Sequence, residues 1–544
     1  MSAIVDHLIV LPIVLPLLSG AGMLLRGGEE HRNLNATINL ISTLALIGIS
    51  TALLQAADSA PADLIGVYRI GYWPAPFAIV LIADRLSALM LLLTSLIAAA
   101  AVVFSIARWH RVGPHFHALF QFLLMGLNGA FLTGDLFNLF VFFELLLAAS
   151  YGLALHGSGV TRVSAGLHYI AVNLAASLLF LIGVSLIYSV AGTLNMADLA
   201  ARIAAVRPED RALFEAGAGI LGIAFLLKSG MWPLCFWLPT TYSAVAPPVA
   251  CIFAMLTKVG AYIVLRLWPL LLGEGAGASA HFGGEWLLLG GMATIAFGTI
   301  GSLASQDMGR LAGFSLLVSS GTVLAAVSIG DVAVTAGTLF YVVSSTLGIA
   351  AFFLLIELVE RGREPGADIL AVTREAYGED DAMQEQEVVG IAIPATMGML
   401  GIAFISSTLV ISGLPPLSGF IAKLAILAAA LNQSVGVQGA SVSPVAWALL
   451  IALILSGFAA LLAMTRAGIR AFWASQDRAV PRVRLIEIGP VLALLILCAL
   501  QTIQAGPVMR FMEATAESLH APEGYIRGVL GPATQRHTQQ TGGT

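Results

Sequence analysis

Long apolar windows recur along the whole chain and are separated by short polar connections. The hydrocarbon layer of a bilayer is about 30 Å thick, so a helix needs about 20 mostly apolar residues to cross it. The pattern therefore predicts about 14 membrane-spanning helices. Their windows are 3–25, 33–55, 80–106, 115–134, 136–155, 165–191, 213–237, 241–271, 286–304, 308–330, 334–358, 390–432, 445–468 and 485–505.

The window at 390–432 is too long for one straight helix, and Pro415-Pro416 interrupts it. We interpret it as one broken span, with two separate spans as the alternative. Period-two alternation is absent, which favours an all-α polytopic membrane protein. The N-terminus has Asp6 and His7 ahead of its apolar run but no basic region or cleavage-type site, so it is predicted to be a first span rather than a signal peptide.

Composition agrees with this class. Of 544 residues, 58% are hydrophobic and only 10% are charged, against about 25% charged in a soluble domain. Arginines gather in the odd-numbered connections, which the positive-inside rule makes cytoplasmic, so both termini are predicted to be external. The arginines of the odd connections are Arg26, Arg32, Arg108, Arg111, Arg162, Arg310, Arg361, Arg363, Arg374, Arg466, Arg470, Arg478, Arg482 and Arg484, and those of the even connections are mainly Arg69, Arg202, Arg207 and Arg211.

Several kinds of site are not indicated. The three cysteines are scattered through apolar windows without CxxC spacing, which argues against a disulfide framework or a zinc site. No GxxxxGK[ST] loop occurs, so ATP-driven transport is not expected. His110, His115 and His117 lie on a basic connection and are interpreted as interfacial histidines rather than metal ligands. No stretch is typical of a nucleic-acid-binding surface.

The lysines are distributed unlike the other cations. The chain has 23 arginines but only three lysines, Lys228, Lys258 and Lys423, and each lysine lies inside an apolar window. A codon bias toward arginine explains the connections, but it does not explain why the three lysines all lie at membrane depth. Arginine essentially always keeps its charge, whereas a buried lysine can release its proton. These positions predict a proton-transfer role.

Helix-interrupting residues accompany two of these lysines. Lys228 is followed closely by Gly230 and Pro233, and Lys423 is preceded by Pro415-Pro416 and Gly419. Backbone groups freed at membrane depth persist only where protein or water satisfies them. Two interrupted helices at corresponding positions in two halves of a chain indicate a transporter site.

Glu144 is an acid inside the apolar run that follows Asp135. A carboxylate at the centre of a membrane helix costs on the order of 2.5–3.5 kcal/mol on insertion scales, so it indicates a functional site. If it faces a lysine, Glu144 can stay ionised and tune the proton affinity of that lysine. The sequence alone does not establish this pairing.

Five motifs together identify a family. The chain resembles the antiporter-like subunits shared by complex I and the multisubunit monovalent cation/proton antiporters, and among these the D-type subunits of the Mrp/Pha antiporters. The resemblance covers roughly residues 80–430, and GTLNM (192–196) agrees with it. The motifs are GDLFNLFVFFE (134–144), KSGMWPLCFWLP (228–239), LTKVGAY (256–262), SQDMGRLAGFS (305–315) and GLPPLSGFIAK (413–423).

The resemblance implies two inverted five-helix repeats, each with one broken helix. It divides the chain into N-terminal helices 1–3 (1–110), a first repeat (111–272), a second repeat (273–470), and a last helix with a tail (471–544). It also implies that Glu144 pairs with Lys228, and that Lys258 and Lys423 continue a proton path. Residues 362–388, with eight acids against two arginines, are predicted to form a solvated cytoplasmic loop within the second repeat, with partner binding as the alternative.

The chain departs from the family at three positions. Where many relatives carry a histidine and a lysine on the eleventh span, this chain has Ser344 and Ser345, so the middle of the path would rely on water and hydroxyls. Tyr242 stands where relatives often have histidine. His168 stands where lysine is frequent, as a proton relay or an interfacial histidine.

The resemblance implies one component of a secondary antiporter in a bacterial inner membrane. Such a component works with other subunits, protons and Na⁺ or K⁺, is not an enzyme, and needs no nucleotide, redox cofactor or metal. One alternative is a proton-pumping membrane subunit of complex I or of a membrane-bound hydrogenase. A second alternative is a structural scaffold, for which the lysines would be dispensable.

Overall fold

The computed structural model describes residues 7–27, 30–59, 66–361, 395–435, 443–472 and 482–531, so the acidic segment 362–388 lies outside the described residues. The described chain is almost entirely helical. Its first half contains α2 (Leu11–Leu25), α3 (Arg32–Ser59), α4 (Arg85–Ala107), α5 (Phe116–Leu132), α6 (Leu136–Ala154), α7 (Val160–Ala191), α8 (Met196–Ile203), α9 (Pro208–Ser229), α10 (Trp237–Ala244) and α11 (Pro247–Leu272).

The second half continues in the same way. Of the short 3-10 turns, η1 (Ile70–Tyr72) lies between the strands β1 (Gly66–Arg69) and β2 (Val80–Ala83), whereas η2 (Trp109–Arg111) and η3 (Glu274–Ser279) link helices. The helices of this half are α12 (Gly284–Ala304), α13 (Met308–Val327), α14 (Val332–Glu360), α16 (Ala395–Ser412), α17 (Ser418–Val435), α18 (Pro444–Phe472), α19 (Leu485–Ile503), α20 (Ala505–His520) and α21 (Pro522–Leu530).

Within the described residues, twelve helices are long and apolar enough to cross a membrane, and α2, α5 and part of α17 are shorter apolar helices. Each of the 14 apolar windows contains at least one helix, which confirms the all-α polytopic class. The number of spans stays a prediction. The window at 390–432 yields α16 and α17, separated by five residues that include both prolines.

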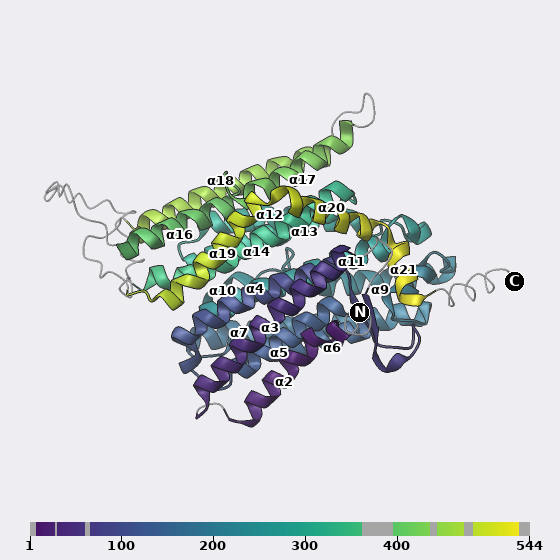
Figure 1. The fold of residues 1–544 in the computed structure, drawn as a ribbon. Helices are drawn as coiled ribbons and strands as arrows, with labels where there is room; N and C mark the ends of the chain where they lie inside the picture. The colour runs from purple at the N-terminus through teal and green to yellow at the C-terminus, as the bar shows by residue number, and fades with distance from the viewer. Residues whose placement is uncertain are drawn as a thin grey trace, which may run out of the picture.

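The bundle is layered around two buried helices. In Figure 1, α2, α3 and α5 lie along the lower side, α16 to α18 lie along the upper side, and α11 and α14 lie between them. Nearly every residue of α11 and α14 is buried, whereas the outer helices expose apolar side chains. Such outer surfaces suit contact with lipid or with other membrane helices.

The two interrupted helices end in closely similar turns. Helix α9 stops at Gly230, which has φ 73°, and the N–H of Met231 donates to the carbonyl of Leu226. Helix α16 stops at Gly413, which has φ 76°, and the N–H of Leu414 donates to the carbonyl of Leu409. Glycine is favoured at a helix end of this left-handed kind because it has no Cβ.

Some elements differ from the apolar pattern. The window at 80–106 begins with a strand, because β2 (Val80–Ala83) pairs antiparallel with β1 (Gly66–Arg69), and α4 starts only at Arg85. Two further helices, α20 and α21, follow the last window. Both are amphipathic rather than uniformly apolar, so a search for apolar runs does not detect them.

Candidate functional site

Glu144 lies on α6, half-buried against α7. The hydroxyl of Ser177, a buried residue of α7, donates a hydrogen bond to Oε1 of Glu144. A hydrogen bond to a carboxylate stabilises its ionised form. The acid therefore has a neutral hydrogen-bond donor beside it, Ser177, which the sequence did not single out.

Lys228 lies on α9 with its ammonium group above the ring of Phe143, 4.7 Å from the ring centroid. Phe143 is the residue next to Glu144, and the charge of Glu144 acts on Lys228. No ion pair within 4 Å joins the two in the described part of the chain, and Nζ of Lys228 is buried without a hydrogen-bond partner. The structure thus brings the acid and the lysine together without direct contact.

The helices that carry Lys228 and Lys258 cross at Gly260. A Cβ at Gly260 would lie 2.5 Å from the hydroxyl and 2.8 Å from the backbone nitrogen of Ser229. Real Cβ atoms do not approach other atoms so closely, so only glycine lets α9 and α11 pack here. The crossing is one residue beyond Lys228 and two beyond Lys258, and it fixes the two lysines relative to one another.

Lys258 begins a chain of hydrogen bonds at the centre of the bundle. Its side chain on α11 is fully buried, and Nζ donates to the hydroxyl of Ser319 on α13 at 2.6 Å. Ser319 in turn donates to the hydroxyl of Ser345 on α14 at 2.9 Å. Hydroxyls can donate and accept at once, so this chain connects three helices through groups able to pass a proton.

The far end of this chain opens onto a small cavity that also reaches Lys423. The space open to the centre of a water-sized sphere is about 20 Å³, and about 10–15 Å³ is enough to hold one water. The cavity is rich in hydroxyls, which suits a hydrogen-bonded water. Its lining comprises Ser302, Ser315, Val318, Tyr341, Ser344, Ser345, Ile349, Val410, Ile411, Gly419, Lys423, Ser456 and Ala460.

Lys423 lies on α17 and donates from Nζ to the carbonyl of Ser412, the last residue of α16, at 2.9 Å. The last carbonyls of a helix lack partners within it and carry partial negative charge. Two glycines make room for the lysine: a Cβ at Gly413 would lie 2.6 Å from Cδ of Lys423, and one at Gly457 would lie 3.3 Å from its Nζ. The break after α16 therefore creates the acceptor for this ammonium group.

The remaining predicted positions have different surroundings. His168 is exposed on α7, and its Nδ1 lies 2.9 Å from the carbonyl oxygen of Ser164 on the same helix. Tyr242 on α10 is fully buried and donates to the carbonyl of Phe253. Ser344 shares a hydrogen bond of 2.7 Å with Ser418, the first residue of α17. Pro233, Pro415 and Pro416 lie in the two helix interruptions.

Two of the three histidines of the α4–α5 connection are buried within the protein. His115 is exposed, but His110 and His117 are buried, and Nδ1 of His117 lies 2.8 Å from the amide nitrogen of Asn39 on α3. Burial and the nearby Arg111 and Arg32 lower the pKa of His110. No group of three or more potential metal ligands occurs within the described ranges.

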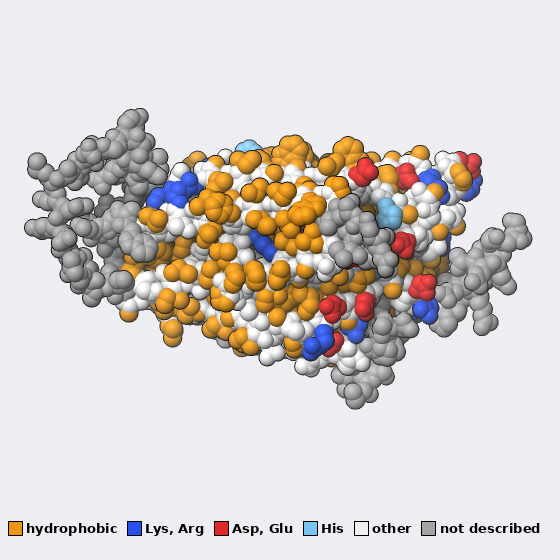
Figure 2. Space-filling view, turned by 90° about the horizontal axis from the view of Figure 1, so that it is seen from above, with side chains coloured by type: hydrophobic (Ala, Val, Ile, Leu, Met, Phe, Trp, Pro, Cys, Tyr) orange, Lys and Arg blue, Asp and Glu red, His pale blue; other side chains and the backbone are white. Residues whose placement is uncertain are grey.

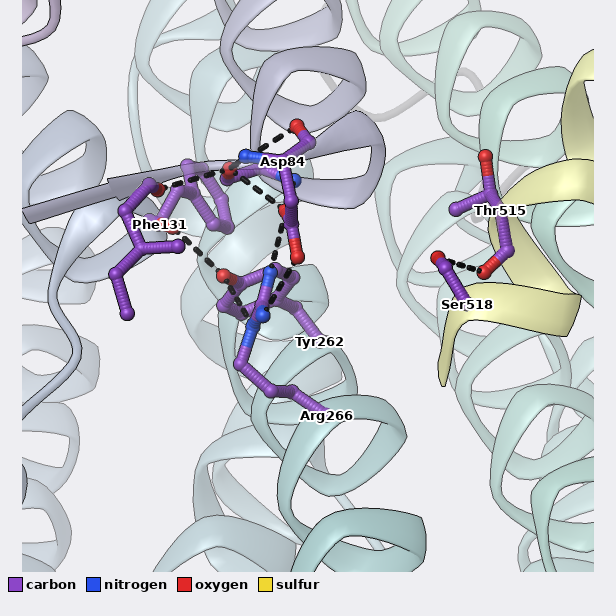
Figure 3. A network of polar contacts seen from close by, with 8 residues as sticks. Asp84, Phe131, Tyr262, Arg266, Thr515 and Ser518 are labelled. Atoms are coloured by element: carbon purple, nitrogen blue, oxygen red, sulfur yellow. Dashed lines mark hydrogen bonds and ion pairs between the residues drawn. The ribbon is translucent and has the colours of Figure 1, made fainter. Parts of the chain in front are cut away.

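A polar cluster that the sequence did not single out lies between the start of α4 and the C-terminal part of α11 (Figure 3). Arg266, buried on α11, makes two hydrogen bonds of 2.8 Å to Asp84 at the start of α4. Its Nε donates to Tyr262, whose hydroxyl donates to the carbonyl of Phe131. Burial would raise the pKa of Asp84, but Arg266 more than offsets it, so the pKa lies below its usual value. The sign of this cluster in the sequence was Arg266, an arginine within the apolar window 241–271.

Comparison with known proteins relates this chain to a family by sequence and by fold. Residues 133–443 match the family model described as NADH:quinone oxidoreductase/Mrp antiporter, transmembrane. A Rhizobium meliloti protein, named as the D component of a probable K(+)/H(+) antiporter, is 60% identical over 96% of this chain and 98% of its own length. The D component of the Na(+)/H(+) antiporter of Alkalihalophilus pseudofirmus is 32% identical over 96% of this chain and 99% of its own. A chain of the Mrp complex from Dietzia has the same fold, with TM-score 0.82, 24% identity, and coverage of 97% and 100%.

Proposed function

Because the chain belongs to the family of Mrp-type antiporter D components, we propose that it is the proton-translocating subunit of a heteromeric monovalent cation/proton antiporter. The exchange is driven by the proton gradient and moves Na⁺ or K⁺ in the opposite direction. Relatives over nearly the full length carry antiporter names, which favours this function over that of a complex I or hydrogenase subunit.

The observation that carries the proposal is the connection between Lys258 and Lys423. Lys258 is hydrogen-bonded through Ser319 to Ser345, and Ser345 and Lys423 line one hydroxyl-rich cavity. A lysine can store a proton, whereas a serine or a water can only relay it. The arrangement therefore supports stepwise transfer between two storage sites, with a relay between them.

Glu144 and Lys228 form the other part of the proposed path. Their charges interact without a direct ion pair, so the carboxylate can favour the protonated lysine without holding its proton in a fixed bond. Loading and unloading of Lys228 then changes the charge near the α9–α11 crossing, beside Lys258. In this proposal, the charge of Lys228 appears and disappears as the lysine gains and loses its proton, and this change drives proton movement along the path.

The setting of the protein is part of the proposal. The chain is a multi-pass membrane protein, and we place it in a bacterial inner membrane beside the other subunits of the complex. The odd-numbered connections are cytoplasmic and both termini external, because the arginines are concentrated in the odd connections. The two interrupted helices with closely similar ends support the two repeats, which we place at 111–272 and 273–470.

Transport by vesicles containing the whole complex tests this function. An imposed pH gradient should move Na⁺ or K⁺ against protons in the wild type, and Ala at Lys228, Lys258 or Lys423 should abolish the exchange. Arg527→Gln, an exposed arginine of α21, is the control and should transport normally. Normal exchange by the lysine variants in an assembled complex would contradict the proposal and indicate that the chain is a structural scaffold.

A further inference from the structure

A basic cleft lies at the ends of four candidate spans. It occurs where α4 and α14 end and where α16 and α19 begin, and its volume is about 810 Å³. No part of the proposed proton path lines it. The lining residues are Ala107, Arg108, Arg361, Thr396, Arg482, Val483, Arg484 and Glu487.

The acids near the cleft neutralise only part of its positive charge. Arg361 is bound to Glu357 at 2.7 Å and to Glu487 at 2.8 Å, and Arg108 lies 3.6 Å from Glu357. Among the described residues, four arginines therefore face two glutamates, and Arg361 makes the shortest ion pair to each of them.

Two arginines of the cleft, Arg482 and Arg484, have no acid partner among the described residues. Arg482 and Arg484 are exposed, and within the described ranges neither guanidinium has an acid within 4 Å. Glu487 also accepts a hydrogen bond from the backbone N–H of Arg484. The guanidinium groups of Arg482 and Arg484 are therefore available to an anion from outside the chain.

The position of the cleft indicates which kind of anion it can bind. The helices α4, α14, α16 and α19 are each long and apolar enough to span a membrane, so their ends lie at the level of the lipid headgroups. Directly beside Arg484, Leu485 is 82% exposed and Ile486 is 38% exposed. The cleft thus combines free guanidinium groups with an adjoining apolar surface, as a charged headgroup with acyl chains requires.

We propose that this cleft binds the phosphate group of an anionic phospholipid, held by Arg482 and Arg484 with Arg108 at the rim. A guanidinium presents a planar fork of donors that matches two phosphate oxygens. Basic pockets between membrane helices are known to take anionic headgroups. The acyl chains lie along the exposed start of α19. The site is independent of the proton path and does not depend on the orientation of the protein in the membrane.

Lipid retention by the purified, delipidated complex tests the proposal. Native mass spectrometry would compare phosphatidylglycerol with phosphatidylcholine for the wild type and for Arg482→Gln/Arg484→Gln. We expect the wild type to retain phosphatidylglycerol in preference to phosphatidylcholine. In the double variant, the ratio of retained phosphatidylglycerol to phosphatidylcholine should be about tenfold lower. Raised salt should weaken binding in the wild type, since the contact is ionic.

The control is Arg207→Gln/Arg527→Gln, whose arginines are exposed but paired with acids. In Figure 1 α21, which carries Arg527, lies at the other end of the bundle from the start of α19. This control should retain phosphatidylglycerol like the wild type. Equal retention by the wild type and the Arg482/Arg484 variant would overturn the site. Displacement of the lipid by millimolar inorganic phosphate would instead assign the site to a soluble phosphate and overturn the lipid assignment.

Discussion

The three buried lysines differ in what holds their ammonium groups. Among the described residues, Lys228 lies over the face of Phe143 without a hydrogen-bond partner, Lys258 has the hydroxyl of Ser319, and Lys423 has the carbonyl of Ser412. In the described residues no lysine belongs to an ion pair within 4 Å, whereas many arginines do. An ammonium group without an acid partner gives up its proton more readily, which is what a carrier requires.

Replacing Lys228 with arginine separates charge from proton transfer. Arginine keeps the positive charge but does not release a proton at any accessible pH. We expect Lys228→Arg to lower exchange as far as Lys228→Ala does, by about 100-fold or more, as for loss of a proton-transferring group. Exchange by the assembled complex in vesicles measures this. An arginine variant that works at nearly the wild-type rate would make Lys228 an electrostatic anchor.

The charge of Glu144 can be removed with little change of shape. In Glu144→Gln the amide oxygen can still accept from the hydroxyl of Ser177, so the local packing of α6 on α7 should persist. We expect exchange to be abolished while the complex still assembles, because only the charge that acts on Lys228 is lost. Ion-driven proton movement and the amount of assembled complex are the two readouts. Normal transport would remove Glu144 from the mechanism.

The residues that could be recognised from the sequence share a simple signal. Lys228, Lys258 and Lys423 stood out because charged residues are rare in apolar windows. The serines that hydrogen-bond Glu144, Lys258 and Lys423 could not be recognised, because a serine is unremarkable in a membrane helix and its contacts depend on how the helices pack. They are Ser177, Ser319 and Ser412, respectively. Arg266 carried the same signal as the lysines, but its partner Asp84 lies before a different helix.

At the scale of helices, α14 carries both Ser344 and Ser345. They have different partners: Ser345 accepts from Ser319, whereas Ser344 contacts Ser418 at the start of α17. Only Ser345 is thus hydrogen-bonded toward Lys258. The interruptions themselves were predictable from glycine and proline, but the cavity between the helices depends on packing that no sequence pattern encodes.

Substitution of these serines should change the rate and the pH optimum separately. Ser344→Ala/Ser345→Ala should slow exchange without shifting its pH optimum, because hydroxyls order water but store no proton. Ser345→Ala alone should account for most of this loss. Ser345→His should instead shift the optimum, because it adds a group that titrates near pH 6.5. Exchange rate against pH would measure both. An unimpaired double alanine variant would mean that the path avoids α14.

The crossing of α9 and α11 gives a test that alters no polar side chain. Gly260→Ala would place a Cβ against the backbone of Ser229, so the two helices must separate. We expect exchange to fall at least tenfold. The matched control is Gly222→Ala on α9, where an added Cβ meets nothing within 4 Å. The amount of assembled complex is measured for both variants, so that a loss of exchange is not confused with a loss of assembly. Equal activity of the two would show that the spacing of the lysine-bearing helices is unimportant.

At the scale of the whole molecule, ion pairs reinforce the ends of the bundle. Arg266 and Asp84 join α11 to α4 at one end, and Arg361 joins α14 to α19 at the other through Glu487. Removing one partner of a buried pair typically costs about 3–5 kcal/mol, so these contacts hold the helices in place. Figure 2 shows an apolar middle on one face, with charge mostly toward the ends and one basic side chain near the centre.

The central claim is that protons pass between Lys258 and Lys423 through the serine-lined cavity. It is tested most directly by filling that cavity while leaving every charged residue in place. Ser456 on α18 lines the cavity, and Ser456→Val would replace its hydroxyl with methyl groups that exclude water. The control is Ser185→Val on the exposed face of α7.

The measurement is proton-driven Na⁺ or K⁺ exchange by vesicles containing equal amounts of assembled complex. The account predicts that Ser456→Val loses at least about tenfold in rate, since a broken relay removes a proton-transfer step, while Ser185→Val keeps the wild-type rate. A wild-type rate in the Ser456→Val complex would contradict the account, because protons would then reach Lys423 without the cavity.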